Sequence, residues 1–303
     1  MPRTGGWWRL SLGTAGYILW APVAQLGLPL VALLLAARVR SPRARRATYV
    51  AAGVSVATIW FSRGYGQAFI AAFTILVTAA FLGWVLLAPG PVWRQSVRAT
   101  VTGALATALL ARAAWGVNWW GAVQWDVRRQ LDYGLQWLVN VFPGSGGTLD
   151  RGIVFASVTI PATLALQALA GLALAWQWHA ALAEEPLGAP LAPFRQFSFG
   201  DHWVWGMVGA FTVWILPALA ILRPAALNLG IVLGVLYLLR GAAIVTAFAG
   251  VVGISTTALA VGGVLSALLA VPLLFVVPGL WTLGIADTWL EFRRRLARRP
   301  TTL

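Results

Sequence analysis

The sequence predicts an all-α polytopic membrane protein, a bundle of about eight to ten transmembrane or half-membrane helices. Two observations support this fold class. The chain has 303 residues, of which 60% are hydrophobic and 10% are charged, whereas a soluble domain is roughly half apolar and a quarter charged. Apolar runs of membrane-spanning length also alternate with short segments that carry arginine, as expected of a polytopic protein.

The first half of the chain contains apolar runs of unequal length. They cover residues 10–37, 47–61, 68–88 and 99–120. Pro22 and Pro29 interrupt the first run, which therefore fits either one long span or two half-depth helices. Five arginines lie within residues 38–46, and the positive-inside rule places them in the cytoplasm. Residues 62–67 are expected to form a turn.

Residues 121–152 are predicted to form an external amphipathic segment. Apolar side chains recur there at helical spacing, at Val127, Leu131, Leu135, Leu138 and Phe142. Polar residues such as Asp126 and Arg128 lie mostly off this stripe. The segment's three arginines balance its three aspartates, which suits a loop outside the cytoplasm. Such a helix lies on the membrane interface and either caps the bundle or binds a partner.

The second half of the chain contains further apolar runs, which cover residues 153–178, 202–222, 229–250 and 256–292. Loop 179–202 and the basic tail 293–303 are expected in the cytoplasm. The last run is nearly long enough for two short tilted passes, so we expect a helical hairpin bent near Pro272. The runs together predict a single, multi-pass membrane domain over residues 1–303, with a cytoplasmic C-terminus, in the bacterial cytoplasmic (inner) membrane.

Arg240 is the residue around which the predicted site is organised. If residues 229–250 form a span, Arg240 lies about 16 Å from its start, near the centre of a hydrocarbon layer about 30 Å thick. A guanidinium there costs about 2.5–3.5 kcal/mol on insertion scales. None of the chain's eight acidic residues lies in the heart of an apolar run. We therefore expect compensation from backbone carbonyls, from the C-termini of broken helices, from lipid phosphates or from an anionic ligand in a cavity near Arg240.

The candidate substrate-binding residues are the polar side chains within or next to the apolar runs. They are Arg240, Arg112, Asn228 and Gln67. Arg112 is expected in the outer half of its span, and Gln67 in the turn before the third run. These residues predict a site for a small-molecule or anionic ligand.

The acid–base inventory predicts that the protein is not an enzyme. The chain has no lysine and no cysteine, which excludes Schiff-base catalysis, a P-loop lysine and thiol chemistry. Its two histidines and scattered acids predict no metal site. We expect no catalytic residue, no cofactor and no nucleic-acid partner. An enzyme acting on lipid would have only Asp287 or His202 as its acid or base.

Several residues of the second half occur in a recognisable order, in the segments PFR, LRG, LGIAD and EFR. The motif positions are Phe194, Arg195, Gly241, Gly284, Asp287 and Arg293, and Asn228 is expected to open the helix that carries LRG. In this order the chain resembles the YybS-like family of bacterial membrane proteins of unknown function. The resemblance implies a small-molecule binding bundle, because that family is distantly similar to the substrate-binding subunits of energy-coupling-factor transporters.

The leading functional expectation is therefore non-enzymatic capture or transport of a small molecule. No ATP-binding motif is present, so such a subunit would need a separate energising partner in the lipid bilayer. The alternative is a structural or assembly protein of the cell envelope without a transported substrate. In that case the external helix and the basic tail would serve as docking surfaces.

Overall fold

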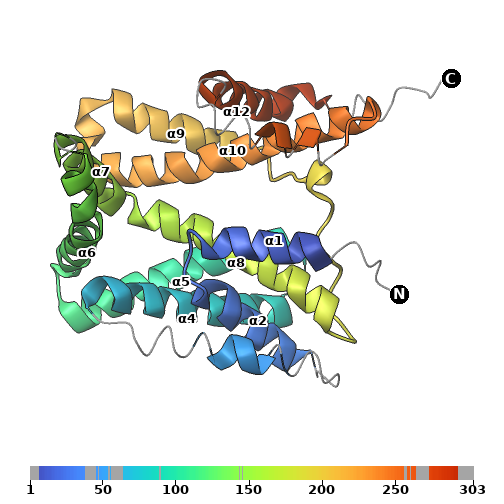
Figure 1. The fold of residues 1–303 in the computed structure, drawn as a ribbon, viewed down its shortest axis with the longest axis horizontal. Coiled ribbons are helices and arrows are strands. Elements are labelled where there is room, and N and C mark those ends of the chain that lie inside the picture. The colour runs from blue at the N-terminus through green and yellow to red at the C-terminus, as the bar shows by residue number, and fades with distance from the viewer. Residues whose placement is uncertain are drawn as a thin grey trace. The chain divides into compact units, whose positions relative to one another are not determined.

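The described part of the chain is built from helices (Figure 1). The computed structural model describes residues 7–37, 46, 48–53, 55, 64–88, 90–142, 144, 146–255, 258–259, 261–263 and 273–292. These residues contain no strand, which confirms the predicted all-α fold class. They belong to two compact units, Met1–Leu191 and Ala192–Leu303, which are described separately. The single domain expected over residues 1–303 stays a prediction.

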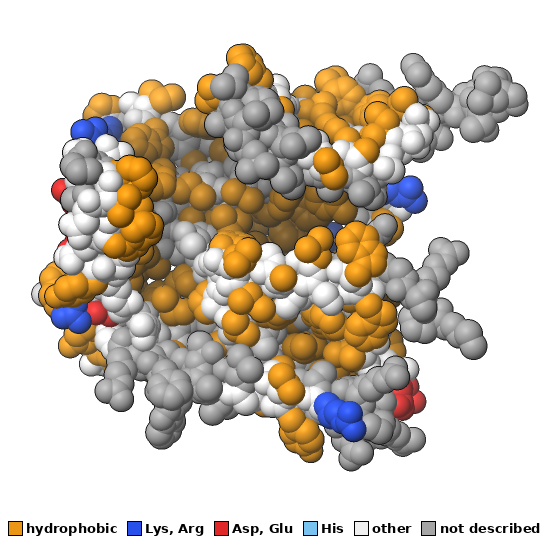
Figure 2. Space-filling model, viewed as in Figure 1, with side chains coloured by type: hydrophobic (Ala, Val, Ile, Leu, Met, Phe, Trp, Pro, Cys, Tyr) orange, Lys and Arg blue, Asp and Glu red, His pale blue; other side chains and the backbone are white. Residues whose placement is uncertain are grey.

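Within the described residues, three helical segments are long and apolar enough to cross a membrane. They are α4 (Tyr65–Leu87), α8 (Ile160–Leu182) and the segment Pro217–Val251, which joins the 3₁₀ helix η2 (Pro217–Leu222) to α10 (Arg223–Val251). Figure 2 shows hydrophobic side chains over much of the face in view and few charged ones. Exposed apolar side chains on such helices suit contact with lipid. The chain is therefore a membrane protein.

Other helices contribute partial or bent spans. The helices α5 (Val92–Trp115) and α6 (Trp119–Val141) pass the same test together, although the chain bends by 97° between them. The shorter apolar helices are α2 (Ala24–Ala36), α9 (Trp203–Ile215) and α12 (Leu273–Leu290). The helix α2 matches the half-depth alternative for residues 10–37, whereas α9 is shorter than the full crossing expected over 202–222.

In the first unit, α4 and α5 form a closely packed pair. A Cβ added at Gly103 of α5 would lie 2.7 Å from the Cα of Val77, so only glycine allows this approach. Leu105 and Leu109 of α5 are exposed, whereas Thr107 is buried and donates a hydrogen bond to the Gly103 carbonyl. Small and polar residues thus face the neighbouring helix and large apolar residues face outward, as in membrane bundles.

The helices α2 and α8 also pack together, and α1 (Trp7–Ile18) packs on α8 (Figure 1). Two hydrogen bonds connect the end of α1 to α8. The Tyr17 hydroxyl donates to the Gln167 carbonyl at 3.0 Å, and the Gln167 amide donates to the Trp20 carbonyl at 2.6 Å. Trp20 lies in the non-helical segment between α1 and α2. Its carbonyl therefore receives a hydrogen bond from the protein, which lipid could not supply.

A buried aspartate fixes α6 against the start of α4. Asp126 is 2% exposed, and its carboxylate accepts hydrogen bonds from the Gly66 N–H at 2.9 Å and the Gln130 amide at 3.0 Å. Gly66 lies in the first turn of α4, where backbone N–H groups lack partners within the helix. Asp126 therefore caps α4 from another helix. Asp126 lies off the apolar stripe of α6, and this side of α6 faces the start of α4.

Several predicted boundaries in the first unit are displaced. The span expected over 99–120 ends at Trp115, because Gly116 adopts a left-handed φ of 77° and the chain turns into α6. Residues 65–67 of the expected turn 62–67 are helical, since α4 begins at Tyr65, and residues 62–63 lie outside the described part of the chain. The span expected over 153–178 divides between α7 (Gly146–Val158) and α8, where Pro161 occupies the first turn of α8.

In the second unit, α9 and α12 both pack on α10, as does the 3₁₀ helix η1 (Phe194–Gln196) (Figure 1). The run expected over 202–222 ends as an α-helix at Ile215 and continues as η2. Asn228 does not open a helix, because α10 already begins at Arg223. The bend expected near Pro272 and the tail 293–303 lie outside the described residues.

Two glycines let the backbones of α10 and α12 touch. A Cβ added at Gly241 of α10 would overlap the carbonyl of Leu280, and a Cβ added at Gly284 of α12 would overlap the carbonyl of Tyr237. Each glycine therefore lies against the backbone of the opposite helix. Any larger residue at either position would push the two helices apart.

We expect Gly284→Ala to lower the free energy of unfolding by about 1–3 kcal/mol, because the added methyl would overpack this contact. Gly279→Ala is the matched control, since Gly279 is exposed on the same helix and no described atom lies within 4 Å of an added Cβ. It should be neutral or stabilising, because alanine exceeds glycine in helix propensity by about 1 kcal/mol. Equal effects of the two variants in a denaturant titration in micelles would contradict the close backbone contact.

Candidate functional site

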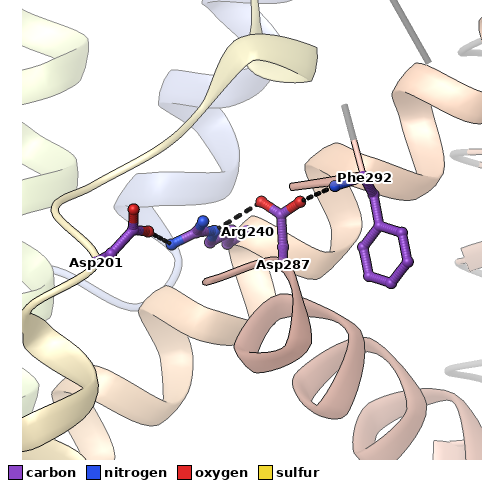
Figure 3. Close-up of polar contacts among 4 residues, drawn as sticks. All are labelled: Asp201, Arg240, Asp287 and Phe292. Atoms are coloured by element: carbon purple, nitrogen blue, oxygen red, sulfur yellow. Dashed lines mark hydrogen bonds and ion pairs between the residues drawn. The ribbon is translucent and has the colours of Figure 1, made fainter. Parts of the chain in front are cut away.

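Arg240 lies between two aspartates (Figure 3). Its Nε donates to Oδ2 of Asp287 at 3.0 Å, and its Nη1 donates to Oδ1 of Asp201 at 2.8 Å. The side chains of Arg240 and Asp287 are 5% and 3% exposed, whereas that of Asp201 is 60% exposed. The group therefore consists of a buried ion pair with a second carboxylate at its open side. We call these three residues the Arg240 cluster.

Each member of the cluster comes from a different element of the second unit. Arg240 belongs to α10, and Asp287 lies in the last turn of α12, 47 residues further along the chain. Asp201 belongs to the turn that precedes α9. The glycine contact between α10 and α12 sets their spacing, because Gly241 follows Arg240 directly and Gly284 lies one turn before Asp287. The cluster thus depends on residues that carry no charge.

Further contacts hold the cluster in place. The N–H of Phe292 donates to Oδ1 of Asp287 at 3.0 Å, just after Glu291 turns the chain with a left-handed φ of 46° (Figure 3). The guanidinium carbon of Arg240 lies 5.7 Å from the centre of the Phe199 ring, which contacts the buried Tyr237 ring at 4.9 Å. The Asp287 carboxylate therefore has a partner for each oxygen, as a buried carboxylate requires.

The expectation that no carboxylate meets Arg240 is wrong. Asp287 lies near the end of a short apolar helix, outside the heart of the run, yet α12 packs along α10 and carries Asp287 to Arg240. A buried guanidinium that is paired and hydrogen-bonded no longer needs an external anion. The two carboxylates bond two of the five N–H groups of Arg240, so its burial does not require an anionic ligand, and a ligand at Arg240 stays a prediction.

The expected depth of Arg240 also changes. The helix α10 has 29 residues and is about 43 Å long, which exceeds a hydrocarbon layer of about 30 Å. Arg240 lies beyond its middle and only 2.8 Å from the exposed Asp201. An ionised carboxylate is stable in water and strongly disfavoured in lipid. We therefore infer that the Arg240 cluster lies at the edge of the hydrocarbon layer and not at its centre.

The structure does not bring the four candidate substrate-binding residues together. Arg112 is exposed in the last turn of α5, and Gln67 is half-buried in the first turn of α4. Asn228 donates to the Pro224 carbonyl at 2.7 Å and lies about 18 Å from Arg240 along α10. Arg112 and Gln67 belong to the first compact unit, whereas Asn228 and Arg240 belong to the second. A shared ligand contact by all four stays a prediction.

Three residues of the predicted family motif lie beside Arg240. Gly241, Gly284 and Asp287 form the crossing of α10 and α12, as described above. Phe194 and Arg195 belong to η1, which packs on α10. Arg293 lies outside the described residues. Within this part of the chain, the roles that geometry assigns to the motif are helix contact and charge pairing.

Sequence reasoning missed Asp201, Phe199 and Asp126 as structural partners. The composition gave one indication that these acids have structural partners. The chain has eight acidic and 22 basic residues, so each carboxylate has many possible basic partners. Asp201 immediately precedes an apolar helix, and Asp126 lies near the start of an amphipathic one. An acid at such a boundary can reach a neighbouring helix end. Which helix end it reaches follows only from the tertiary fold.

No group of three or more His, Asp or Glu suited to a metal ion occurs in the parts of the chain described here. Comparisons of the chain with protein-family models, with curated proteins and with solved structures find no match. The YybS-like resemblance therefore stays a prediction.

The inferred depth can be tested with single cysteines, since the natural chain contains none. We expect Asp201→Cys to react with a membrane-impermeant maleimide in intact membranes, because that side chain is 60% exposed and, by our inference, lies at the edge of the hydrocarbon layer. Met207→Cys on α9 is the control, since Met207 is 5% exposed and should stay unlabelled until the protein is denatured. If the Asp201→Cys variant reacts from neither side of the membrane, Arg240 lies deeper than we infer.

Proposed function

We propose that the chain is a non-enzymatic structural or assembly protein of the bacterial inner membrane. The observation that carries this proposal is the occupancy of Arg240 by Asp287 and Asp201, which uses the strongest candidate ligand group to join α10, α12 and the turn before α9. Asp126 has an equivalent role in the first unit, where it joins α6 to α4. Buried charges that fix helices are expected of a scaffold.

A scaffold needs surfaces for a partner. The basic segments 38–46 and 293–303 are the docking surfaces that we propose on the cytoplasmic side, in accordance with the positive-inside rule. This orientation also places loop 179–202 in the cytoplasm. Arginine-rich segments beside a membrane attract anionic lipids and acidic protein surfaces.

Capture or transport of a small molecule is the second candidate. The observation in its favour is a cavity of about 10 Å³ in the first unit, lined by Gln25, Thr78 and apolar side chains of α2, α4 and α8. Gln25 is 3% exposed, and neither its amide nor the Thr78 hydroxyl has a hydrogen-bond partner among the described residues. The cavity has room for about one water. A metabolite would therefore enter only if the helices separated, and an energising partner would have to drive that step.

Native mass spectrometry combined with crosslinking in cells distinguishes the two candidates. For an assembly protein, we expect no retained metabolite and a defined crosslinked protein whose yield falls when Arg293, Arg294 and Arg295 are replaced by glutamine. Arg112→Gln is the control, because Arg112 is exposed in the other unit and carries no proposed docking role. A stoichiometric metabolite that is lost in Gln25→Leu would contradict the assembly proposal and support capture.

A further inference from the structure

A polar groove of about 350 Å³ lies between α6 and α7 in the first unit. Its volume falls within the range of small-ligand sites. The groove is lined by two arginines, two aspartates and a tryptophan together with apolar side chains, and the polar and aromatic members are Trp125, Arg128, Arg129, Asp132 and Asp150. The two arginines and two aspartates give it a formal charge of zero.

Side chains within and next to the groove hold the two arginines in position. The Nε of Arg128 donates to the Ser157 hydroxyl at 2.8 Å, and Ser157 is fully buried and donates in turn to the Val154 carbonyl. The guanidinium of Arg129 lies 4.7 Å from the centre of the Trp125 ring and 3.7 Å from the buried Asp126 carboxylate. Less side-chain entropy is therefore lost when these arginines bind an anion.

The two aspartates complete a site with opposite charges on one surface. Asp132 belongs to α6 and Asp150 to α7, and both side chains are exposed along the same groove. Arginine forks suit the oxygens of a phosphate, and carboxylates accept hydrogen bonds from an ammonium group. The arrangement thus matches a ligand that carries a phosphate and an amine close together.

The groove lies next to features of a membrane interface. The helix α6 begins beside an aromatic cluster, in which the Phe69 ring stacks on Trp119 at 5.6 Å and contacts Trp120 at 6.1 Å. The chain bends by 97° between α5 and α6, so α6 runs across the direction of the apolar helix before it. Tryptophan-rich, amphipathic helices with this orientation lie at the level of the lipid headgroups.

We propose that this groove binds the headgroup of a zwitterionic phospholipid with a primary amine, the phosphoethanolamine group. Arg128 and Arg129 contact the phosphate, and Asp132 and Asp150 accept hydrogen bonds from the ammonium. A choline headgroup has no N–H to donate. A glycerol headgroup has no cation, so it would leave both aspartates beside an anion. The proposal holds whether the protein serves assembly or capture.

The test is retention of lipid by the purified full-length chain in native mass spectrometry, with phosphatidylethanolamine, phosphatidylcholine and phosphatidylglycerol supplied in equal amounts. We expect wild type to retain mainly phosphatidylethanolamine. Asp132→Asn with Asp150→Asn should lose this preference and retain relatively more phosphatidylglycerol, because the carboxylates then no longer repel an anionic lipid. Arg128→Gln with Arg129→Gln should lose most bound lipid.

Arg94→Gln is the control, since Arg94 is exposed on α5 in the same unit and does not line the groove. It should bind lipid as wild type does. The aspartate variant keeps the test independent of folding, because both aspartates are exposed and neither holds a helix end. Equal retention of the three lipids by wild type, or an unchanged preference in the aspartate variant, would overturn the proposal.

Discussion

The ion pair between Arg240 and Asp287 is the interaction on which the second unit depends. The Arg240 side chain is 5% exposed inside an apolar bundle, so it is stable only if an opposite charge and hydrogen bonds replace the water that it has lost. Asp287 supplies the charge, and the exposed Asp201 supplies a second acceptor. The pair can form because Gly241 and Gly284 let the two helix backbones touch. Packing and electrostatics therefore support each other at one crossing.

An acidic side chain also joins two helices in the first unit. Asp126 is buried and joins α6 to the N-terminal turn of α4, where a negative charge is favoured by the free N–H groups and by the helix dipole. Asp126, Asp201 and Asp287 thus each connect segments that are far apart in the sequence. Since the chain has eight acids, using three of them in this way is a substantial share. This use favours a role in holding helices over a role in chemistry.

Apolar run length predicted the fold class, because the bilayer requires long apolar helices and this requirement acts locally. The helix ends at Gly116 and Pro161 were not predicted, since both residues lie within apolar runs that were expected to be continuous. The partner of Arg240 could not be predicted in the same way. Asp287 is 47 residues away, and its approach depends on how α10 and α12 cross. The groove between α6 and α7 likewise requires Asp150 to meet Arg128 from another helix.

The most direct test of this account is a double-mutant cycle on Arg240 and Asp287, measured by reversible unfolding in mixed micelles. Arg240→Met and Asp287→Leu should each destabilise strongly, by about 3–5 kcal/mol. Arg240→Met leaves the buried Asp287 without its cation, and Asp287→Leu leaves the buried Arg240 with only the exposed Asp201 as its ionic partner. The double variant should lose less than the sum of the two, with a coupling free energy of about 1–3 kcal/mol. Single effects that add to within about 0.5 kcal/mol would show that the two residues act independently and would contradict the account.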